Sequence, residues 1–173
     1  MKKVLTILAA TLIATAAMAQ TAEENFKKAG DAYNAGKQKE AFSYMLKAAE
    51  QGHDKAQYCV AVWYGQGNGV EKSPKKYAEW MEKAAAQGMV MAQARIALCY
   101  SNGDGVKKNL KKAVEWWQKA ADKGDTDSQC LLGLCYYEGQ GVPKNTKKGL
   151  ELIRKAADQG NEEAKKALKK LGY

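Results

Sequence analysis

The chain has 173 residues, of which 46% are hydrophobic, 27% are charged and only two are proline. This length is typical of a single domain, and the composition excludes an intrinsically disordered chain. The formal net charge of +9 favours acidic partners, anionic lipid headgroups or cell-envelope polymers, because a basic surface attracts them electrostatically.

The first 19 residues have the pattern of a secretory signal peptide. Two lysines precede an apolar run over residues 4–17, and small residues stand at the two positions that a signal peptidase reads, Ala17 and Ala19. The run is too short to span a bilayer comfortably, and no later stretch approaches the roughly 20 apolar residues of a spanning helix. We therefore predict a signal peptide over residues 1–19 and no transmembrane segment in the mature chain.

Cleavage after Ala19 leaves a mature domain of residues 20–173. The cut removes two lysines and no acidic residue, so the formal charge falls from +9 to +7. No cysteine follows the cut to accept a lipid anchor. The sequence therefore predicts a soluble protein that is periplasmic or secreted.

A period of 36 residues organises the mature chain. Glycines recur at this interval, each closing a Lys-Ala-Ala-x-x-Gly segment, at Gly52, Gly88, Gly124 and Gly160. A tyrosine and a Gly-x-Gly-Val segment between them keep the same period. Units of this size cannot bury their own apolar faces, so they must stack on their neighbours. The predicted repeats are approximately 22–52, 53–88, 89–124 and 125–160, followed by a capping segment over 161–173.

Each repeat is predicted to be a pair of helices. In the first helix, small and apolar residues lie on one face, for example at Ala92, Ile96 and Tyr100. That helix ends at the Gly-x-Gly segment, where glycine can adopt the positive φ of a helix stop. The second helix begins at a residue whose side chain accepts hydrogen bonds from the free amides of the first turn: Ser73, Asn109 or Asn145.

The two ends of the mature chain differ from the central repeats. The first pair, from Asn25 to Gln51, is shorter and lacks the Gly-x-Gly-Val segment. Near the C-terminus Ala164 restarts the first-helix pattern, but Lys169 and Lys170 replace an apolar pair, which predicts a capping helix. The predicted fold class is all-α: a right-handed α-solenoid of antiparallel helix pairs.

The motif of these repeats resembles the Sel1-like repeat (SLR) family, which is related to the tetratricopeptide repeat (TPR). The resemblance covers about Lys55 to the end of the chain, and the first pair is more similar to a plain TPR unit. The residues that carry it are Ser128, Leu132, Gly133, Tyr136, Gly139, Gly141 and Val142, with Lys112, Ala113, Trp116, Lys119, Ala120, Ala121 and Gly124.

The likeness to TPR units implies a concave groove on the first helices, where extended or helical peptides dock. Apolar residues that the packing positions do not account for fall in that register, with basic residues nearby to meet acidic groups. The alternative is that several of them pack against the neighbouring repeat. The predicted groove residues are Tyr58, Val62, Arg95, Leu98, Leu134 and Tyr137.

A ladder of lysines is the second candidate surface, which we name the basic edge. If the repeats stack, these lysines line one edge of the solenoid. Most lie in the first turn of a second helix, where the helix macrodipole disfavours positive charge. The alternative is a solvated edge without a ligand. The basic edge consists of Lys72, Lys75, Lys76, Lys108, Lys111, Lys112, Lys144, Lys147 and Lys148.

Metal and cofactor binding are not predicted. The single histidine, His53, is predicted to be an exposed turn residue, because unrelated residue types occupy its position in the other repeats. The four cysteines lack the close paired spacing of a zinc site. They are either small buried thiols or disulfide partners, such as Cys59 with Cys99. The four are Cys59, Cys99, Cys130 and Cys135.

Catalysis is not predicted either. Because cysteine-rich SLR proteins are often labelled β-lactamase-like, a cell-wall-linked hydrolase is the alternative function that the resemblance implies. The one Ser-x-x-Lys segment, Ser73 to Lys76, comes without the Ser-Asp-Asn and Lys-Thr-Gly elements of such a site, and Ser73 is explained as a helix cap.

The predicted function is that of a secreted or periplasmic binding module. Its partner is a protein or peptide, with an acidic one favoured by charge, and it docks on the concave face while the basic edge adds electrostatic steering. No specific nucleic-acid binding is predicted.

Overall fold

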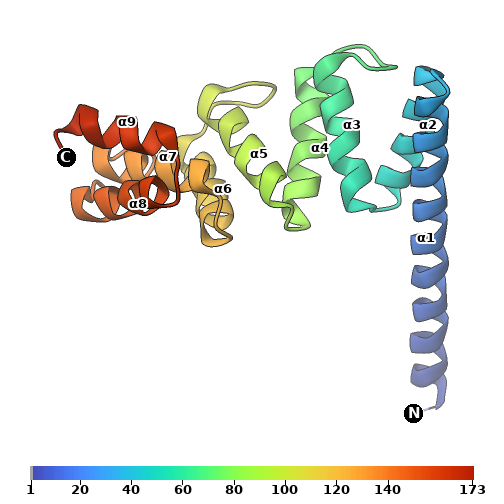
Figure 1. The fold of residues 1–173 in the computed structure, drawn as a ribbon. Helices are drawn as coiled ribbons and strands as arrows, with labels where there is room; N and C mark the ends of the chain where they lie inside the picture. The colour runs from blue at the N-terminus through green and yellow to red at the C-terminus, as the bar shows by residue number, and fades with distance from the viewer. Residues whose placement is uncertain (1) are drawn as a thin grey trace. The chain divides into compact units, whose positions relative to one another are not determined.

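The computed structural model describes the backbone of residues 2–173 and the side chains of residues 15–173. Every regular element in that part of the chain is a helix (Figure 1), which confirms the predicted all-α fold. The helices are α1 (Lys2–Asn34), α2 (Gln38–Glu50), α3 (Asp54–Gln66), α4 (Pro74–Ala86), α5 (Val90–Asn102), α6 (Leu110–Asp122), α7 (Thr126–Glu138), α8 (Thr146–Asp158) and α9 (Glu162–Leu171).

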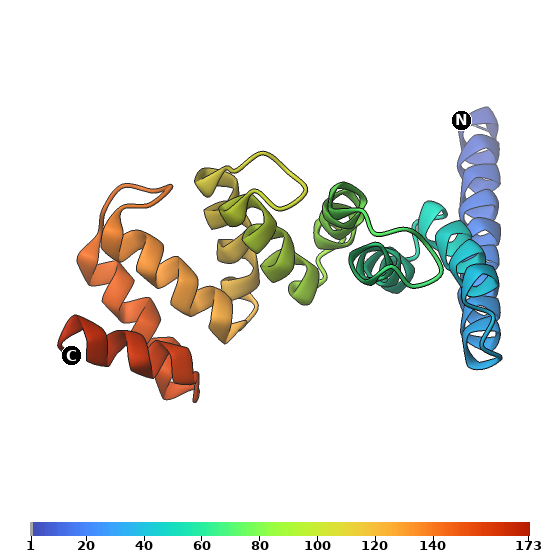
Figure 2. The ribbon, with the colours of Figure 1, turned by 90° about the horizontal axis from the view of Figure 1, so that it is seen from above.

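The chain divides into two compact units, Met1–Trp80 and Met81–Tyr173. Within each unit, successive helices pack as hairpins: α1 lies beside α2 in the first unit, and α7 lies beside α8 in the second (Figures 1 and 2). These hairpins are the helix pairs that the 36-residue period predicts, and the fold is an all-α helical repeat solenoid.

The first unit has a core of small residues and aromatic rings. Ala29 of α1 and Ala41 of α2 are fully buried, which allows the two helices to approach closely. The ring of Phe42 meets the ring of Tyr64 edge-on, with centroids 5.2 Å apart, so it joins α2 to α3. The turn between α1 and α2 is short and contains Gly36 at a φ of 74°, as expected for a pair without the Gly-x-Gly-Val segment.

Among the described side chains of α1, the first buried one is Ala22, which is 3% exposed. The preceding residues with described side chains, 15–21, are all exposed. The predicted signal peptide spans residues 1–19, and Met1 and the side chains of residues 2–14 lie outside the described part. Among the helices of the described region, none combines the length and apolar character needed to cross a membrane.

The second unit is built from the end of α4 and from α5 to α9. Its largest fully buried side chains each come from a different helix: Met81, Ile96, Leu132 and Ile153. Ala164 of α9 is also fully buried, while Leu168 is only partly covered. The restarted first-helix pattern near the C-terminus therefore forms a helix that packs through a narrow apolar face.

The helix ends follow the predicted residue types. The Asn109 side chain accepts a hydrogen bond from the backbone N–H of Lys112 at 3.0 Å, and Asn145 accepts one from Lys148 at the same distance. Gly103 and Gly139 end α5 and α7 with φ values of 90° and 80°. These caps fix where each second helix starts, and therefore which side chains face outward from its first turn.

The prediction that His53 is an exposed turn residue is wrong in its exposure. The residue does lie at a turn, as the N-cap of α3, but its side chain is only 12% exposed. Its ring stacks on Phe26 of α1 with centroids 4.4 Å apart, and Nδ1 accepts a hydrogen bond from the N–H of Ala56 at 3.1 Å. The Nε2 atom lies 3.0 Å from a carboxylate oxygen of Glu23. The period does not predict this burial, because the ring is covered by residues of α1, a helix that differs from the first helices of the later repeats.

Candidate binding site

A hollow opens on the first helices of the second unit, where α5, α7 and α9 present their outer faces. Its volume is about 510 Å³, within the range of sites that hold small ligands or side chains of a partner. Its lining contains apolar and charged side chains. We name the apolar ones the floor, Leu98, Cys130, Leu131, Leu134 and Ala167, and the charged ones, which are all exposed, the rim: Asp127, Glu163, Lys166 and Lys170.

Two residues that line the hollow occupy the same position in successive repeats. Leu98 and Leu134 are 36 residues apart and both lie two residues after a fully buried core residue, Ile96 or Leu132. Two residues along a helix correspond to a rotation of about 200°, so a core residue on one face places the leucine on the other. Leu98 is 41% exposed. Leu98 therefore faces solvent, whereas Leu134 and Ala167 are partly buried and pack against the core cluster that includes Cys130. For Leu134 the alternative, packing against the neighbouring helices, is thus also met.

Most of the charges on the rim are already paired. Lys166 lies 2.7 Å from Glu163, and Asp127 accepts a hydrogen bond of 2.6 Å from the Asn161 amide. Lys170 has no hydrogen bond or ion pair among the described residues. The rim therefore offers one ammonium group to an incoming acidic group.

The structure brings together part of the predicted groove. Leu98 and Leu134 line the hollow, whereas Arg95 and Tyr137 lie on the same helices outside its lining. Tyr58 and Val62 lie half-buried on α3 of the first unit, so their role in a groove stays a prediction. The lining residues that the sequence reading missed are Asp127, Cys130, Leu131, Glu163, Lys166, Ala167 and Lys170.

A usable signal for the missed residues was present in the period. Adding 36 to Leu134 gives Lys170, and adding 36 to Leu131 gives Ala167. The groove register therefore continues into α9, for which the sequence predicts only a capping helix.

The thiols have a packing role. All four cysteines in the described part are free: Cys59, Cys99, Cys130 and Cys135. Burial raises the pKa of each, to about 11 for Cys99 and Cys135. At neutral pH these groups are protonated and poorly nucleophilic, because the thiolate is the reactive form. Cys130 thus contributes an uncharged, apolar group to the floor of the hollow.

One row of the basic edge is held by tyrosines. The Nζ atoms of Lys112 and Lys148 donate hydrogen bonds to the hydroxyls of Tyr100 and Tyr136, at 3.2 and 2.8 Å. The same ammonium groups lie 4.8 and 4.0 Å from the ring centroids, which adds a cation–π attraction. Local contacts thus explain this row.

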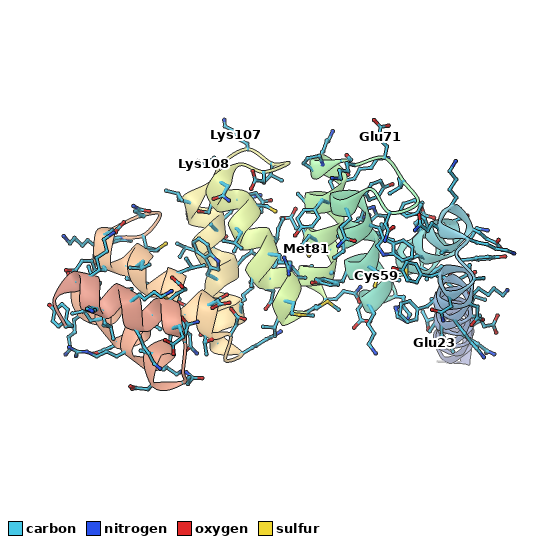
Figure 3. All side chains as sticks on the ribbon, turned by 45° about the horizontal axis from the view of Figure 1, so that its top comes forward. Glu23, Cys59, Glu71, Met81, Lys107 and Lys108 are labelled. Atoms are coloured by element: carbon cyan, nitrogen blue, oxygen red, sulfur yellow. The ribbon has the colours of Figure 1, made fainter. Side chains whose placement is uncertain are left out.

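The other two rows differ from it. Lys72, Lys108 and Lys144 place their aliphatic stems against the glycine that ends the preceding helix. Lys75, Lys111 and Lys147 are exposed, with no hydrogen bond or ion pair among the described residues. Figure 3 shows Lys108 with the adjacent Lys107 on the loop between α5 and α6.

The Ser-x-x-Lys segment acts as a helix cap. Ser73 Oγ accepts a hydrogen bond from the backbone N–H of Lys76 at 3.3 Å. The Lys76 ammonium lies 3.4 Å from the hydroxyl of Tyr64, so it follows the same lysine–tyrosine pattern as the later repeats. Within the described residues, no group of three or more histidine, cysteine or acidic side chains is arranged to hold a metal ion.

Helix pairs at a fixed period, with glycine turns and an apolar hollow on the first helices, define a helical repeat protein of the kind that mediates protein interaction. The Sel1 repeat family matches residues 28–53, 54–89, 90–125 and 126–161, and the chain belongs to this family. Sel1 repeat proteins are protein-interaction modules and are generally non-enzymatic scaffolds.

Three solved structures place the chain among Sel1 repeat proteins. A Sel1 repeat protein from Oxalobacter formigenes is 34% identical, with a TM-score of 0.68, over 81% of this chain and 56% of that one. The protective antigen c5321 of uropathogenic Escherichia coli, described as having an SLR fold, is 32% identical, with a TM-score of 0.74, over 83% of this chain and 32% of that one. Cysteine-rich protein B of Helicobacter pylori is 31% identical, with a TM-score of 0.56, over 75% and 93%. No curated protein matches the chain.

Proposed function

We propose that the chain is an exported binding module that holds a peptide segment of a partner protein in the hollow formed by α5, α7 and α9. The observation that carries this proposal is the apolar floor of the hollow, which is open to solvent at Leu98 and continues to Leu134 and Ala167. A contiguous apolar surface that stays open to solvent is a common mark of an interaction site.

The lining indicates what the peptide must offer. Burying one aliphatic side chain contributes about 1.5–3 kcal/mol, so two apolar side chains on the floor would supply a useful share of micromolar affinity. An acidic group placed beside Lys170 would add a charge-assisted contact, since the other rim charges have partners. The matching segment is therefore short and apolar, with one carboxylate.

Selection from a displayed peptide library tests this reading. We expect enriched peptides that carry apolar residues next to an acidic one. Substituting Leu98→Ala should weaken their binding by roughly tenfold, because the truncation removes contact area worth about 1.4 kcal/mol. Fluorescence anisotropy with a labelled selected peptide measures the dissociation constant, and circular dichroism checks that the helices are intact.

The matched control is Met91→Ala on the same helix. Met91 is 58% exposed and lies outside the lining, so its truncation should leave the affinity unchanged. If both variants lost the same affinity for the peptide, or if Leu98→Ala lost none, the hollow would not be the binding site. Tyr58→Ala tests separately whether the α3 surface of the first unit binds a peptide.

Export is proposed from the leader pattern and is compatible with the way α1 packs. Residues 15–21 are exposed and the first buried side chain among the described residues is Ala22, so a chain that begins at Gln20 retains every described buried residue of α1. We expect the protein isolated from the periplasm or medium to begin at Gln20, as read by mass spectrometry. Ala19→Leu should block processing, because the peptidase accepts only a small residue there, while Met18→Leu should not. Retention of full-length protein in the cytoplasm would contradict the proposal.

A further inference from the structure

Charged side chains separate to the two ends of the helix pairs in the second unit. The loops 103–109 and 139–145 and the first turns of α6 and α8 carry seven lysines and one acidic residue, Asp104. The short turns at the opposite ends of these helices are mostly acidic, with six carboxylates within 122–127 and 158–163 and one lysine, although the last turns of α6 and α8 add Lys119 and Lys155. Because the helices of a pair run antiparallel, each set gathers at one end. We name the lysine-rich set the basic end: Lys107, Lys108, Lys111, Lys112, Lys144, Lys147 and Lys148.

Two lysines of the basic end are unfavourably placed for stability. Lys111 and Lys147 are each the second residue of a helix, where the amides of the first turn and the macrodipole already carry partial positive charge. Their neighbours Lys112 and Lys148 are compensated by tyrosine hydroxyls. Lys111 and Lys147 have no such partner among the described residues, so local energetics do not account for them.

We propose that the basic end binds a linear polyanion that carries phosphate groups along its length. The same pattern of lysines occurs twice, once at the start of α6 and once at the start of α8. This repetition suits a ligand whose negative charges also repeat along its length. This surface is separate from the apolar hollow, and the proposal does not depend on the peptide-binding function.

The basic end combines lysines with two helix N-termini, at the start of α6 and of α8. Lysine binds phosphate as a point charge, and the amides and macrodipole of a helix N-terminus also favour phosphate groups. The two arginines of the chain, Arg95 and Arg154, lie outside the basic end, so the comparison with a carboxylate polymer tests whether phosphate is preferred. In addition, none of the exposed large hydrophobic residues lies in the two loops or in the first turns of α6 and α8, so this end has no apolar anchor for a lipid surface.

Binding of inorganic polyphosphate to the intact chain, measured at several salt concentrations, tests the proposal. We expect the affinity to fall steeply with salt, because each lysine that neutralises a phosphate releases a counterion. The double substitution Lys111→Glu with Lys147→Glu should weaken binding at least tenfold. It should also reduce the slope of log affinity against log salt by roughly 1.4, at about 0.7 for each lost contact. The same variant should melt at a higher temperature, since the new carboxylates complement the macrodipole.

The opposite signs of these two effects separate a binding role from a structural one. A control with the same change in net charge is Lys119→Glu with Lys155→Glu, in the last turns of the same two helices. It should retain polyphosphate binding to within about twofold.

Several results would overturn the proposal. Equal losses in both double variants would mean that only net charge matters. Equal affinity for polyglutamate would mean that phosphate is not recognised, and tighter binding to phosphatidylglycerol vesicles would make the partner a membrane. Unchanged polyphosphate binding in the Lys111→Glu and Lys147→Glu variant would show that the basic end is a solvated surface.

Discussion

Replacing Gly141 by alanine is expected to destabilise the second unit by about 3–4 kcal/mol. Gly141 has a φ of 71°, a conformation that costs a residue with a Cβ atom about 1–2 kcal/mol. A Cβ atom would also lie only 2.6 Å from the backbone carbonyl of Leu110, which cannot rotate away. Overpacking of this kind costs a further 1–3 kcal/mol or so. Urea denaturation followed by circular dichroism measures the change in the free energy of unfolding.

A second glycine separates the two causes. Gly124 has a φ of 91°, but a Cβ atom there would meet nothing within 4 Å. Gly124→Ala should therefore cost only the backbone strain, about 1–2 kcal/mol. If Gly141→Ala and Gly124→Ala proved equally destabilising, the close approach to Leu110 would contribute nothing and the loop would be free to move.

The period predicts that both glycines of the Gly-x-Gly segment belong to a turn. It does not show that the two glycines have different structural roles. The first, such as Gly139, ends a helix. The second rests on the start of the preceding second helix: Gly141 on Leu110, and Gly69 on Gln38 in the first unit. This contact joins one helix pair to the pair before it. A pattern in one sequence shows that a glycine recurs, whereas only the fold shows which backbone it touches.

The binding site was predictable to the extent that the repeat makes it. Leu98 and Leu134 were predicted because they are apolar and lie off the main packing face; Leu98 is exposed in the structure, whereas Leu134 also packs against the core. The charged rim was not recognised, since Glu163 and Lys166 resemble ordinary solvent-exposed helix residues until their mutual contact is seen. The lysine–tyrosine contacts were missed for a related reason. Their members are 12 residues apart, on different helices, and only the turn between the helices brings them together.

Two glycines of the last helix pair, Gly133 and Gly149, depart from the residue types that the other repeats have at the same positions. The repeat position of Gly133 is alanine in the other central repeats, at Ala61 and Ala97, which suggests that alanine would be tolerated there. The position of Gly149 is likewise alanine in the preceding repeat, at Ala113. In the structure the two glycines face each other across the α7–α8 contact, and a Cβ atom on Gly149 would lie 2.7 Å from the carbonyl oxygen of Gly133. The last helix pair is therefore packed backbone against backbone.

Gly149→Ala is accordingly expected to lower the free energy of unfolding by about 2 kcal/mol. The substitution should gain up to about 1 kcal/mol of helix propensity, but the new methyl group meets the backbone of both Gly133 and Tyr137, and overpacking against rigid atoms costs about 3 kcal/mol. Urea denaturation of the second unit measures the difference. The control is Gly30→Ala, which lies inside α1, meets nothing within 4 Å and should stabilise the chain by up to about 1 kcal/mol. A gain in stability from both substitutions would mean that α7 and α8 can separate freely, in which case the floor of the hollow that α7 carries would not be rigidly held either.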